Sequence, residues 1–379
     1  MPKQKNQHYV PKFYQRLFSV DGNTIGVYIP EQGKKIDSAN IKFQASEDYL
    51  YTNETENEDN IESAIGSLEG EAKIVIEKLL LDSPAELTRE EEYVLYVFVL
   101  LQFGRTLNEM ETLQMTADKM VQQILRVEKR FHNNKDGDAI SDDFIDNVKM
   151  KFANLGAFSV VAYLQLIPLC IDVMREYKVL INRTKKSFVT SDNPACLYNM
   201  FLEKCGISNG GAGCRGIMFY LALSADRAVL YYDSKVYKCG FKKRKEIEIT
   251  NEQDVEELNK LTAVNSRKLF LFNSSRTRRV ELEKMAAQMA HYKIKTPVEE
   301  ISGVNIESGK NIIGTHRFGN SCNLKLSFVK YLPLYNAITA ETFNPQTDMF
   351  REIAYYKDEL EKRFMEDIEN KKENQGTVL

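Results

Sequence analysis

The first residue suited to chemistry is a histidine near the start of the chain. His8 stands in the segment Gln7-His8-Tyr9-Val10-Pro11, and only four histidines occur in 379 residues. Imidazole is the side chain that exchanges protons most readily near neutral pH. Because His8 comes just before an aromatic-rich helix that would hold it in place, it could transfer a proton. A hydrogen-bonded structural role is the alternative.

Gln102 and Arg105 form a second candidate pair. They lie three residues apart in a strongly apolar segment, so both would project from one face of a helix. A buried guanidinium needs an anionic partner, because an unpaired buried charge is costly. That partner is either a carboxylate within the protein or the phosphate or carboxylate of a ligand. Arg105 is therefore a candidate anion clamp, and Gln102 would orient the bound group.

Asp192 and Asn193 precede Pro194 at the end of a predicted strand. A proline keeps the preceding residue extended, so Asn193 cannot begin a helix. Polar residues at strand ends are held by a rigid sheet and often form sites. Asp192 could act as a general acid or base, or as a ligand of Mg²⁺, while Asn193 positions substrate. The alternative is an Asx turn, in which Asp192 only binds nearby backbone.

The elements expected to position these residues change in character along the chain. Helical spacing covers 60–81, and a capping box at Thr88 and Glu91 begins a helix expected to run to about Leu113. Further helices are expected over 117–133, 141–153, 157–176, 277–292 and 346–372. Strands are expected at 24–29, 177–182, 187–190, 217–223, 228–232 and 269–272, with mostly loop over 30–60. This pattern predicts an α+β fold, with a predominantly helical first half, a small mainly antiparallel sheet in the middle and a mixed C-terminal part.

Composition is that of an ordinary globular protein, with 43% apolar and 28% charged residues. The net charge of −3 lacks the basic excess of proteins that coat nucleic acid, although the basic runs 242–245 and 276–279 could contact phosphates. The longest apolar stretch, Phe158–Ile171, contains Gln165 and Pro168 and is shorter than a membrane span, so it predicts a buried helix. With no apolar signal segment, a cytoplasmic protein with six free cysteines is expected.

Seven short motifs, taken in order, resemble those of the bacterial DUF4238 family. They are Gln7 to Pro11 with Phe13-Tyr14, Gln44 to Ser46 with Tyr49 to Tyr51, Glu62 with Glu69, Gln102-x-x-Arg105-Thr106, Phe188 to Pro194, Leu221 to Ser224, and Leu258-Asn259. The resemblance covers about residues 5–275. It implies a core domain over 1–275 and a mixed extension over 276–379 that could pack on it. The chain departs from the family pattern at Ala222, where the family usually has proline.

The resemblance adds two carboxylates to the candidate site. Glu62 and Glu69 are seven residues apart, two helical turns, so they share one face of the first long helix. With Asp192 they could hold Mg²⁺, which is the metal expected if the protein uses one. Otherwise, either glutamate could be the internal partner of Arg105.

Together these residues offer a proton carrier, an anion clamp and carboxylates. Such groups favour a hydrolase acting on phosphodiester or phosphoester bonds, most simply a nuclease whose substrate is a nucleic acid or nucleotide. A role as a defence effector would suit such a bacterial protein. The alternative is a non-catalytic sensor or partner-binding module. In that case the same residues would bind an anionic ligand, and the C-terminal region would bind a protein partner. Neither hypothesis requires a membrane.

Overall fold

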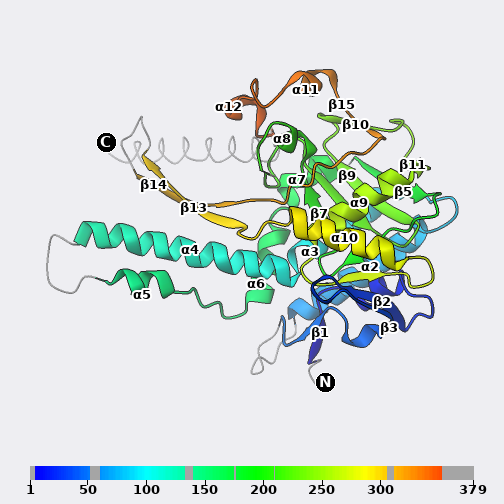
Figure 1. The fold of residues 1–379 in the computed structure, drawn as a ribbon, viewed down its shortest axis with the longest axis horizontal. Helices are drawn as coiled ribbons and strands as arrows, with labels where there is room; N and C mark the ends of the chain where they lie inside the picture. The colour runs from blue at the N-terminus through cyan, green and yellow to red at the C-terminus, as the bar shows by residue number, and fades with distance from the viewer. Residues whose placement is uncertain are drawn as a thin grey trace, which may run out of the picture.

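A five-stranded sheet lies at the centre of the molecule (Figure 1). The computed structural model describes residues 5–51, 60–132, 140–174, 176–208, 210–304 and 311–351. The strands of this sheet are β5 (Tyr177–Asn182), β7 (Ala195–Tyr198), β8 (Met218–Ala222), β9 (Arg227–Tyr232) and β11 (Glu246–Ile249). They follow the order β11-β5-β9-β8-β7, and every neighbouring pair is antiparallel except β11 with β5. Every residue of β5, β8 and β9 is buried, so both faces of the sheet are covered.

A second sheet joins the N-terminal segment to the middle of the chain. It contains β2 (Thr24–Ile29), β3 (Lys34–Asn40), β6 (Thr190–Ser191) and β12 (Phe270–Phe272), in the order β3-β2-β12-β6. Nearby, β1 (Asn6–His8) pairs with β4 (Ser46–Asp48). Strand β3 lies at the edge of the sheet, where a loop was expected. Its residues are mostly polar, so the sequence showed no strand pattern there. Gly33, with φ +58°, makes the turn that brings β3 back onto β2.

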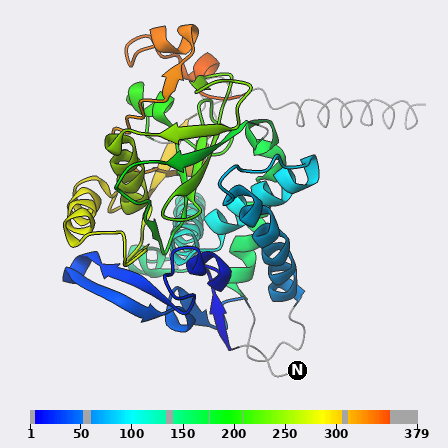
Figure 2. The same ribbon diagram turned by 90° about the vertical axis from the view of Figure 1, so that its right-hand side faces the viewer.

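Helices cover the central sheet from both sides (Figure 2). On one side are α2 (Asn60–Leu79), α3 (Arg89–Gly104), α6 (Leu155–Leu164) and α7 (Ile167–Met174). On the other are α9 (Glu252–Asn265) and α10 (Arg279–Tyr292), and the shorter helices are α1 (Lys12–Arg16), α8 (Met200–Lys204) and the 3₁₀ turns Pro30–Gln32 and Ile41–Phe43. The expected mixture of helices and sheets is confirmed.

Helix α3 begins as predicted but ends early. Thr88 Oγ1 accepts a hydrogen bond from the Glu91 N–H at 3.3 Å, and Glu91 Oε2 accepts one from the Thr88 N–H at 3.0 Å, which confirms the capping box. The prediction of one helix to about Leu113 is wrong, because the helix is interrupted between Gly104 and α4 (Leu107–His132). Gly104 is a poor helix former, and the Tyr163 ring occupies the space that a Cβ there would fill.

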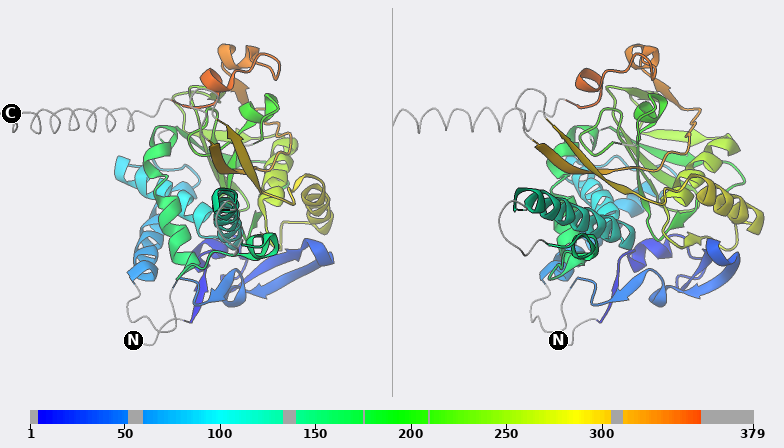
Figure 3. Two further views of the ribbon diagram at one scale, coloured as in Figure 1. Left: turned by 90° about the vertical axis from the view of Figure 1, so that its left-hand side faces the viewer. Right: turned by 60° about the vertical axis from the view of Figure 1, so that its left-hand side comes forward.

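An arm extends from one side of the body. It consists of α4, α5 (Asp142–Asn147) and the hairpin of β13 (Val298–Val304) and β14 (Asn311–Arg317), which lies along α4 (Figures 1 and 3). Arg126 of α4 bridges the parts of the arm, with ion pairs to Asp146 at 2.6 Å and to Glu300 at 2.7 Å.

Two described segments beyond residue 275 contact the preceding part of the chain. Strand β15 (Val329–Tyr331) pairs with β10 (Tyr237–Cys239), and Ser327 donates two hydrogen bonds to the Asp254 carboxylate. The short helices α11 (Pro333–Ala337) and α12 (Pro345–Asp348) follow. Most of the helix predicted over 346–372 lies outside the described residues.

The apolar stretch Phe158–Ile171 does not form the single buried helix that was predicted. It is divided between α6 and α7, and the side chains of Phe158 and Val161 are 48% and 49% exposed. Among the described residues, no single helix is long and apolar enough to cross a membrane. Only Leu155–Leu164 and Ile167–Val173 taken together, bent by 45°, have the required length and composition.

Candidate functional site

Arg105 connects three segments at the break between α3 and α4. Arg105 is 1% exposed, and its guanidinium pairs with Glu69 Oε1 at 2.5 Å. It also donates to the His8 carbonyl oxygen and, through Nε, to the Tyr51 hydroxyl at 3.2 Å. The anionic partner that the sequence required is therefore a carboxylate of the protein itself.

Glu62 lies two helical turns before Glu69 on α2 and binds the N-terminal segment. Gln7 Nε2 donates to Glu62 Oε2 at 2.8 Å, and Gln7 Oε1 accepts from the Tyr51 N–H at 2.7 Å. The structure thus brings Glu62, Glu69, Arg105 and the backbone of His8 into one network, which ties β1 to α2 and α3.

The His8 imidazole has a structural partner. Its Nε2 lies 3.3 Å from the Ile41 carbonyl oxygen, which can only accept, so Nε2 carries the proton. Burial lowers the pKa of His8 to about 4, and the positive charge of Lys12 acts in the same direction. The ring is therefore neutral at physiological pH. Its role as a proton carrier stays a prediction that this environment does not favour.

We expect His8 to make stability fall in acid. Its pKa is depressed in the folded state, so between about pH 6.5 and 4 the unfolded chain binds a proton that the folded chain does not. The contribution is fully present above the unfolded pKa and is lost as pH falls through the folded pKa, amounting to about 3 kcal/mol. Urea unfolding of wild type and His8→Gln, compared from neutral to acid pH, measures this. Parallel pH profiles for the two proteins would contradict it.

Asp192 holds the turn between α9 and β12. One carboxylate oxygen accepts from Ser266 Oγ at 3.0 Å and the Arg267 N–H at 2.8 Å, and the other from the N–H groups of Lys268 and Leu269 at 2.7 and 3.1 Å. A carboxylate offers about four lone-pair positions, so these four donors use its capacity. Burial raises the pKa of Asp192, while the donors act in the opposite direction.

Asn193 and Gln102 differ sharply in their surroundings. The Asn193 side chain accepts from Thr106 Oγ1 at 2.9 Å and donates to the Asn265 carbonyl oxygen at 2.9 Å, so it locks the start of α4 to the end of α9. Gln102 is fully buried, yet neither its amide oxygen nor its amide nitrogen has a hydrogen-bond partner among the described residues. Its predicted role in orienting a ligand stays a prediction, and a buried amide without partners is uncommon.

The predicted Mg²⁺ ligands all have partners within the protein, and Mg²⁺ binding stays a prediction. The Asp192 oxygens bind the turn, Glu69 binds Arg105 and Glu62 binds Gln7. Within the described ranges no group of three or more His, Cys, Asp or Glu side chains could hold a metal.

A pocket of about 270 Å³ lies beside these residues, between α4, α6, the end of α9 and the segment that follows α10. Glu109, 1% exposed, accepts from the Tyr163 hydroxyl at 2.5 Å and pairs with Arg317 at 2.6 Å. Arg317 also donates to the Tyr163 hydroxyl at 2.6 Å. Burial and the adjacent Glu109 carboxylate raise the pKa of Tyr163, so its hydroxyl stays protonated.

The opposite wall of the pocket rests on the Asp192 turn. Lys293 lines the pocket and donates to the carbonyl oxygens of Ser266 and Arg267 at 2.6 and 3.1 Å. Burial lowers the pKa of Lys293, and the Asp192 carboxylate opposes this change. Asn265, also in the wall, donates to the Asn193 carbonyl oxygen at 3.0 Å. Asp192 and Asn193 therefore support a pocket wall without lining the pocket themselves.

Sequence reasoning missed the residues that line this pocket. Glu109 follows the Gln102-x-x-Arg105 motif directly, but on an amphipathic helix it resembles any solvated glutamate. Tyr163 lies in a stretch read only for its hydropathy, and Lys293 and Arg317 lie beyond residue 275, where the resemblance ends.

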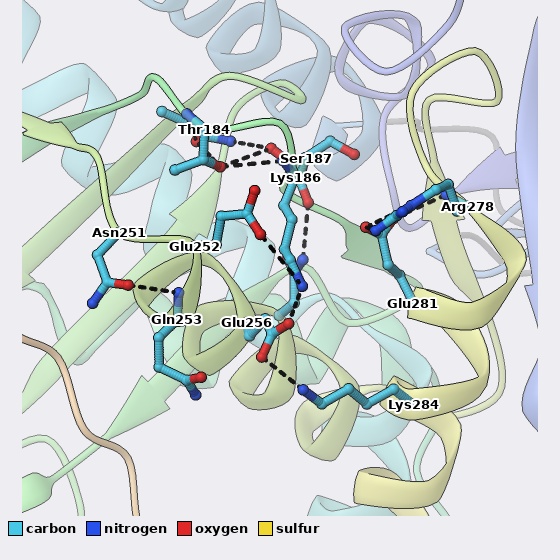
Figure 4. Close-up of polar contacts among 12 residues, drawn as sticks. Thr184, Lys186, Ser187, Asn251, Glu252, Gln253, Glu256, Arg278, Glu281 and Lys284 are labelled. Carbon is cyan, nitrogen blue, oxygen red and sulfur yellow. Dashed lines mark hydrogen bonds and ion pairs between the residues drawn. The ribbon is translucent and has the colours of Figure 1, made fainter.

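The cations of the basic run 276–279 are paired with carboxylates of the protein. Arg276 pairs with Asp226, Arg278 with Glu281 and Arg279 with Glu283. Figure 4 shows the neighbouring cluster between α9 and α10, in which Lys186 and Lys284 both pair with Glu256. These pairs neutralise the cations that could otherwise contact phosphates.

Comparison with known proteins supports the motif resemblance. A family model described as "Protein of unknown function (DUF4238)" matches residues 6–276, and this match includes the Arg105 network and the Asp192 turn. No curated protein and no solved structure matches the chain. Because the family model covers well over half of the sequence, this protein belongs to the DUF4238 family.

Proposed function

We propose that this protein binds a small anionic ligand, such as a phosphate ester, in the pocket beside α4. The proposal rests on the surroundings of Lys293. Lys293 lines the pocket and its ammonium group binds two backbone carbonyl oxygens, and in the described part of the chain no carboxylate lies within ion-pair distance of it. A partly buried cation without a carboxylate partner is suited to an anion from outside.

The partners of the predicted catalytic residues favour binding over catalysis. Arg105 has Glu69, Asp192 has four donors and the neutral His8 ring has Ile41. None of these groups offers a free charge at the pocket. The binding reading corresponds to a sensor or partner-binding module, and a protein partner for the C-terminal region belongs to the same proposal.

A second candidate, hydrolysis of a phosphoester or phosphodiester, is favoured by one group of side chains. Glu109 and Tyr163 share a hydrogen bond at 2.5 Å, and the 40%-exposed Arg317 side chain lies against both. A carboxylate and a phenol can move a proton, and a guanidinium can stabilise negative charge on a reacting phosphate. In that case the substrate would be a nucleotide or nucleic acid, and the protein would be a nuclease with a role in defence.

The binding proposal predicts that anions stabilise the protein through Lys293 and Arg317. Thermal unfolding with inorganic phosphate, pyrophosphate, adenosine monophosphate or adenosine should show a rise in Tm with the phosphate compounds only. The rise should be lost in Lys293→Gln and Arg317→Gln, which keep hydrogen-bond donors but remove the charge. Arg126→Gln, an arginine of α4 outside the pocket, is the matched control and should keep it.

Absence of any shift at millimolar phosphate compounds, or an equal shift in all variants, would refute the binding site. Hydrolysis is tested on the same panel and on single-stranded DNA. Release of phosphate or cleavage by wild type that is lost in Glu109→Gln and Tyr163→Phe would establish the second candidate. Cleavage that persists in both variants would exclude the pocket as its site.

A further inference from the structure

Exposed basic residues gather on the two-stranded sheet of β10 and β15 and on the turn that follows β10, on the side of the body away from the arm (Figure 1). They belong to two segments, 234–245 and 318–340, neither of which contains an aspartate or a glutamate. These segments carry eight lysines and arginines, although the whole chain has a net charge of −3. We use the name basic strip for Phe241 and the cations Lys238, Lys242, Lys243, Arg244 and Lys330.

The sheet holds two lysines against each other. Lys238 of β10 and Lys330 of β15 are directly opposite, and both are exposed. Residues opposite each other in an antiparallel pair share a face, with Cα atoms about 4.5–5.5 Å apart, and like charges there are destabilising. Neither lysine forms an ion pair among the described residues, so the protein itself does not offset this repulsion. An anion from outside would do so.

The turn after β10 carries three more cations on a fixed backbone. Lys242, Lys243 and Arg244 are exposed, and in the described chain no carboxylate lies within ion-pair distance of them. Beneath them Lys178 of β5, 2% exposed, donates to the carbonyl oxygens of Phe241 and Arg244 at 2.9 and 2.5 Å. The turn is therefore tied to the central sheet, and a ligand would not have to order a loose loop.

An exposed aromatic ring lies among these cations. Phe241 is 76% exposed, more than any other large apolar side chain of the described residues, and the Arg244 guanidinium carbon is 5.9 Å from the centre of its ring. Surfaces that bind single-stranded nucleic acid combine cations, which contact phosphates, with rings on which bases stack. Unpaired bases offer a free face to such a ring, whereas recognition of a duplex relies on its shape and backbone.

The surroundings of the strip restrict the kind of partner. Carboxylates of Asp82, Glu246 and Glu248 line a pocket on one side of the turn, so a polyanion fits along β10 and β15 and not into that pocket. Within the strip Phe241 is the one exposed large apolar side chain. Attachment to a membrane surface depends on a larger buried apolar area, so nucleic acid is favoured over lipid.

From these observations we infer that the basic strip binds single-stranded nucleic acid. The cations contact successive phosphates, and one base stacks on the Phe241 ring. Such contacts read the backbone and the face of a base, so little sequence preference is expected. No residue of the strip lines the proposed ligand pocket, and the inference therefore does not depend on that pocket.

Fluorescence anisotropy with a labelled oligothymidylate of about 12 nucleotides, at about 50 and 200 mM salt, tests the cations. Lys242→Gln with Lys243→Gln should weaken binding about tenfold at the lower salt and reduce the salt slope by about 1.4, since each phosphate contact on a single strand contributes about 0.7. The matched control, Arg278→Gln with Arg279→Gln, removes the same charge from arginines that pair with glutamates. It should bind like wild type.

Two further variants separate binding from folding. Phe241→Ala should weaken binding about fivefold or more, the usual effect of losing one stacked base. Phe43→Ala should not, although Phe43 is 66% exposed with Lys42 Nζ 5.6 Å from its ring centre. Lys238→Gln with Lys330→Gln should weaken binding without lowering the Tm, because it removes two charges that repel each other.

Failure of wild type to bind the oligonucleotide at micromolar protein and low salt would overturn the inference. Equal losses in the two double glutamine variants, or tighter binding to the duplex with oligoadenylate, would do the same. Binding to phosphatidylglycerol vesicles through Lys242 and Lys243, without oligonucleotide binding, would assign the strip to lipid instead. Lys293→Gln should bind the oligonucleotide normally, so failure of the ligand pocket and failure of the basic strip are distinguishable.

Discussion

Replacing Arg105 with methionine is expected to lower the free energy of unfolding by about 3–5 kcal/mol. The substitution removes an arginine side chain that is 2% exposed and that pairs with Glu69, whose side chain is 23% exposed. It leaves the Glu69 carboxylate with little water and no partner, and it removes the donor that binds the His8 carbonyl oxygen. Whole proteins are typically stable by about 5–15 kcal/mol, so this loss is a large fraction of the total and should lower the urea midpoint markedly.

Arg183→Met is the matched control for this experiment. Arg183 likewise pairs with one carboxylate, donating at 3.0 and 2.9 Å to Glu248, but the two side chains are 49% and 59% exposed. Exposed pairs contribute little, so its loss should change stability by less than about 1 kcal/mol. The double variant Arg105→Met/Glu69→Met should recover part of the loss, because no buried charge is left unpaired.

Equal stability of Arg105→Met and Arg183→Met would show that the Glu69 pair is not the reason for Arg105. If such a stable variant also lost the response to phosphate compounds, Arg105 would instead be the ligand clamp that the sequence suggested. Urea unfolding gives the first quantity and thermal shift the second.

Asp192→Ala is expected to be nearly as damaging, with a loss of about 3 kcal/mol or more. The substitution leaves the N–H groups of Arg267, Lys268 and Leu269 without their acceptor, at a position where Asp192 is 3% exposed. Hydrogen bonds to a charged acceptor are stronger than neutral ones, and unsatisfied buried donors are costly. Asp192→Asn keeps one carbonyl oxygen and should lose less.

Asp37→Ala, at an exposed carboxylate paired with Lys35, controls for the loss of an acidic residue and should stay within about 1 kcal/mol of wild type. Asp192→Asn should also weaken the response to phosphate compounds, because the same turn provides the two carbonyl oxygens that hold Lys293. If wild type shows no hydrolysis and Asp192→Ala is as stable as wild type, the structural role is contradicted. A stable Asp192→Ala that has lost a wild-type hydrolytic activity would restore its catalytic reading.

The sequence by itself determined the features that depend on neighbouring residues. The capping box at Thr88 and Glu91, the shared face of Glu62 and Glu69, and the need of Arg105 for an anion follow from helical geometry and from the energy of burying a charge. Motif order also identified the family. Each of these inferences rests on interactions within a few turns of the chain, or on a property of one side chain.

Only the tertiary structure decided which partner each group takes. Tyr163 and Arg317 lie 54 and 208 residues from Glu109 in the sequence, and Ser266 lies 74 residues from Asp192, so no local pattern relates them. A local pattern likewise cannot tell whether the anion beside Arg105 is Glu69 or a ligand, because both satisfy a guanidinium equally well. Packing of α2 against α3 settles that choice by placing Glu69 at 2.5 Å. The pocket residues Glu109, Tyr163, Lys293 and Arg317 become recognisable only when four distant segments meet.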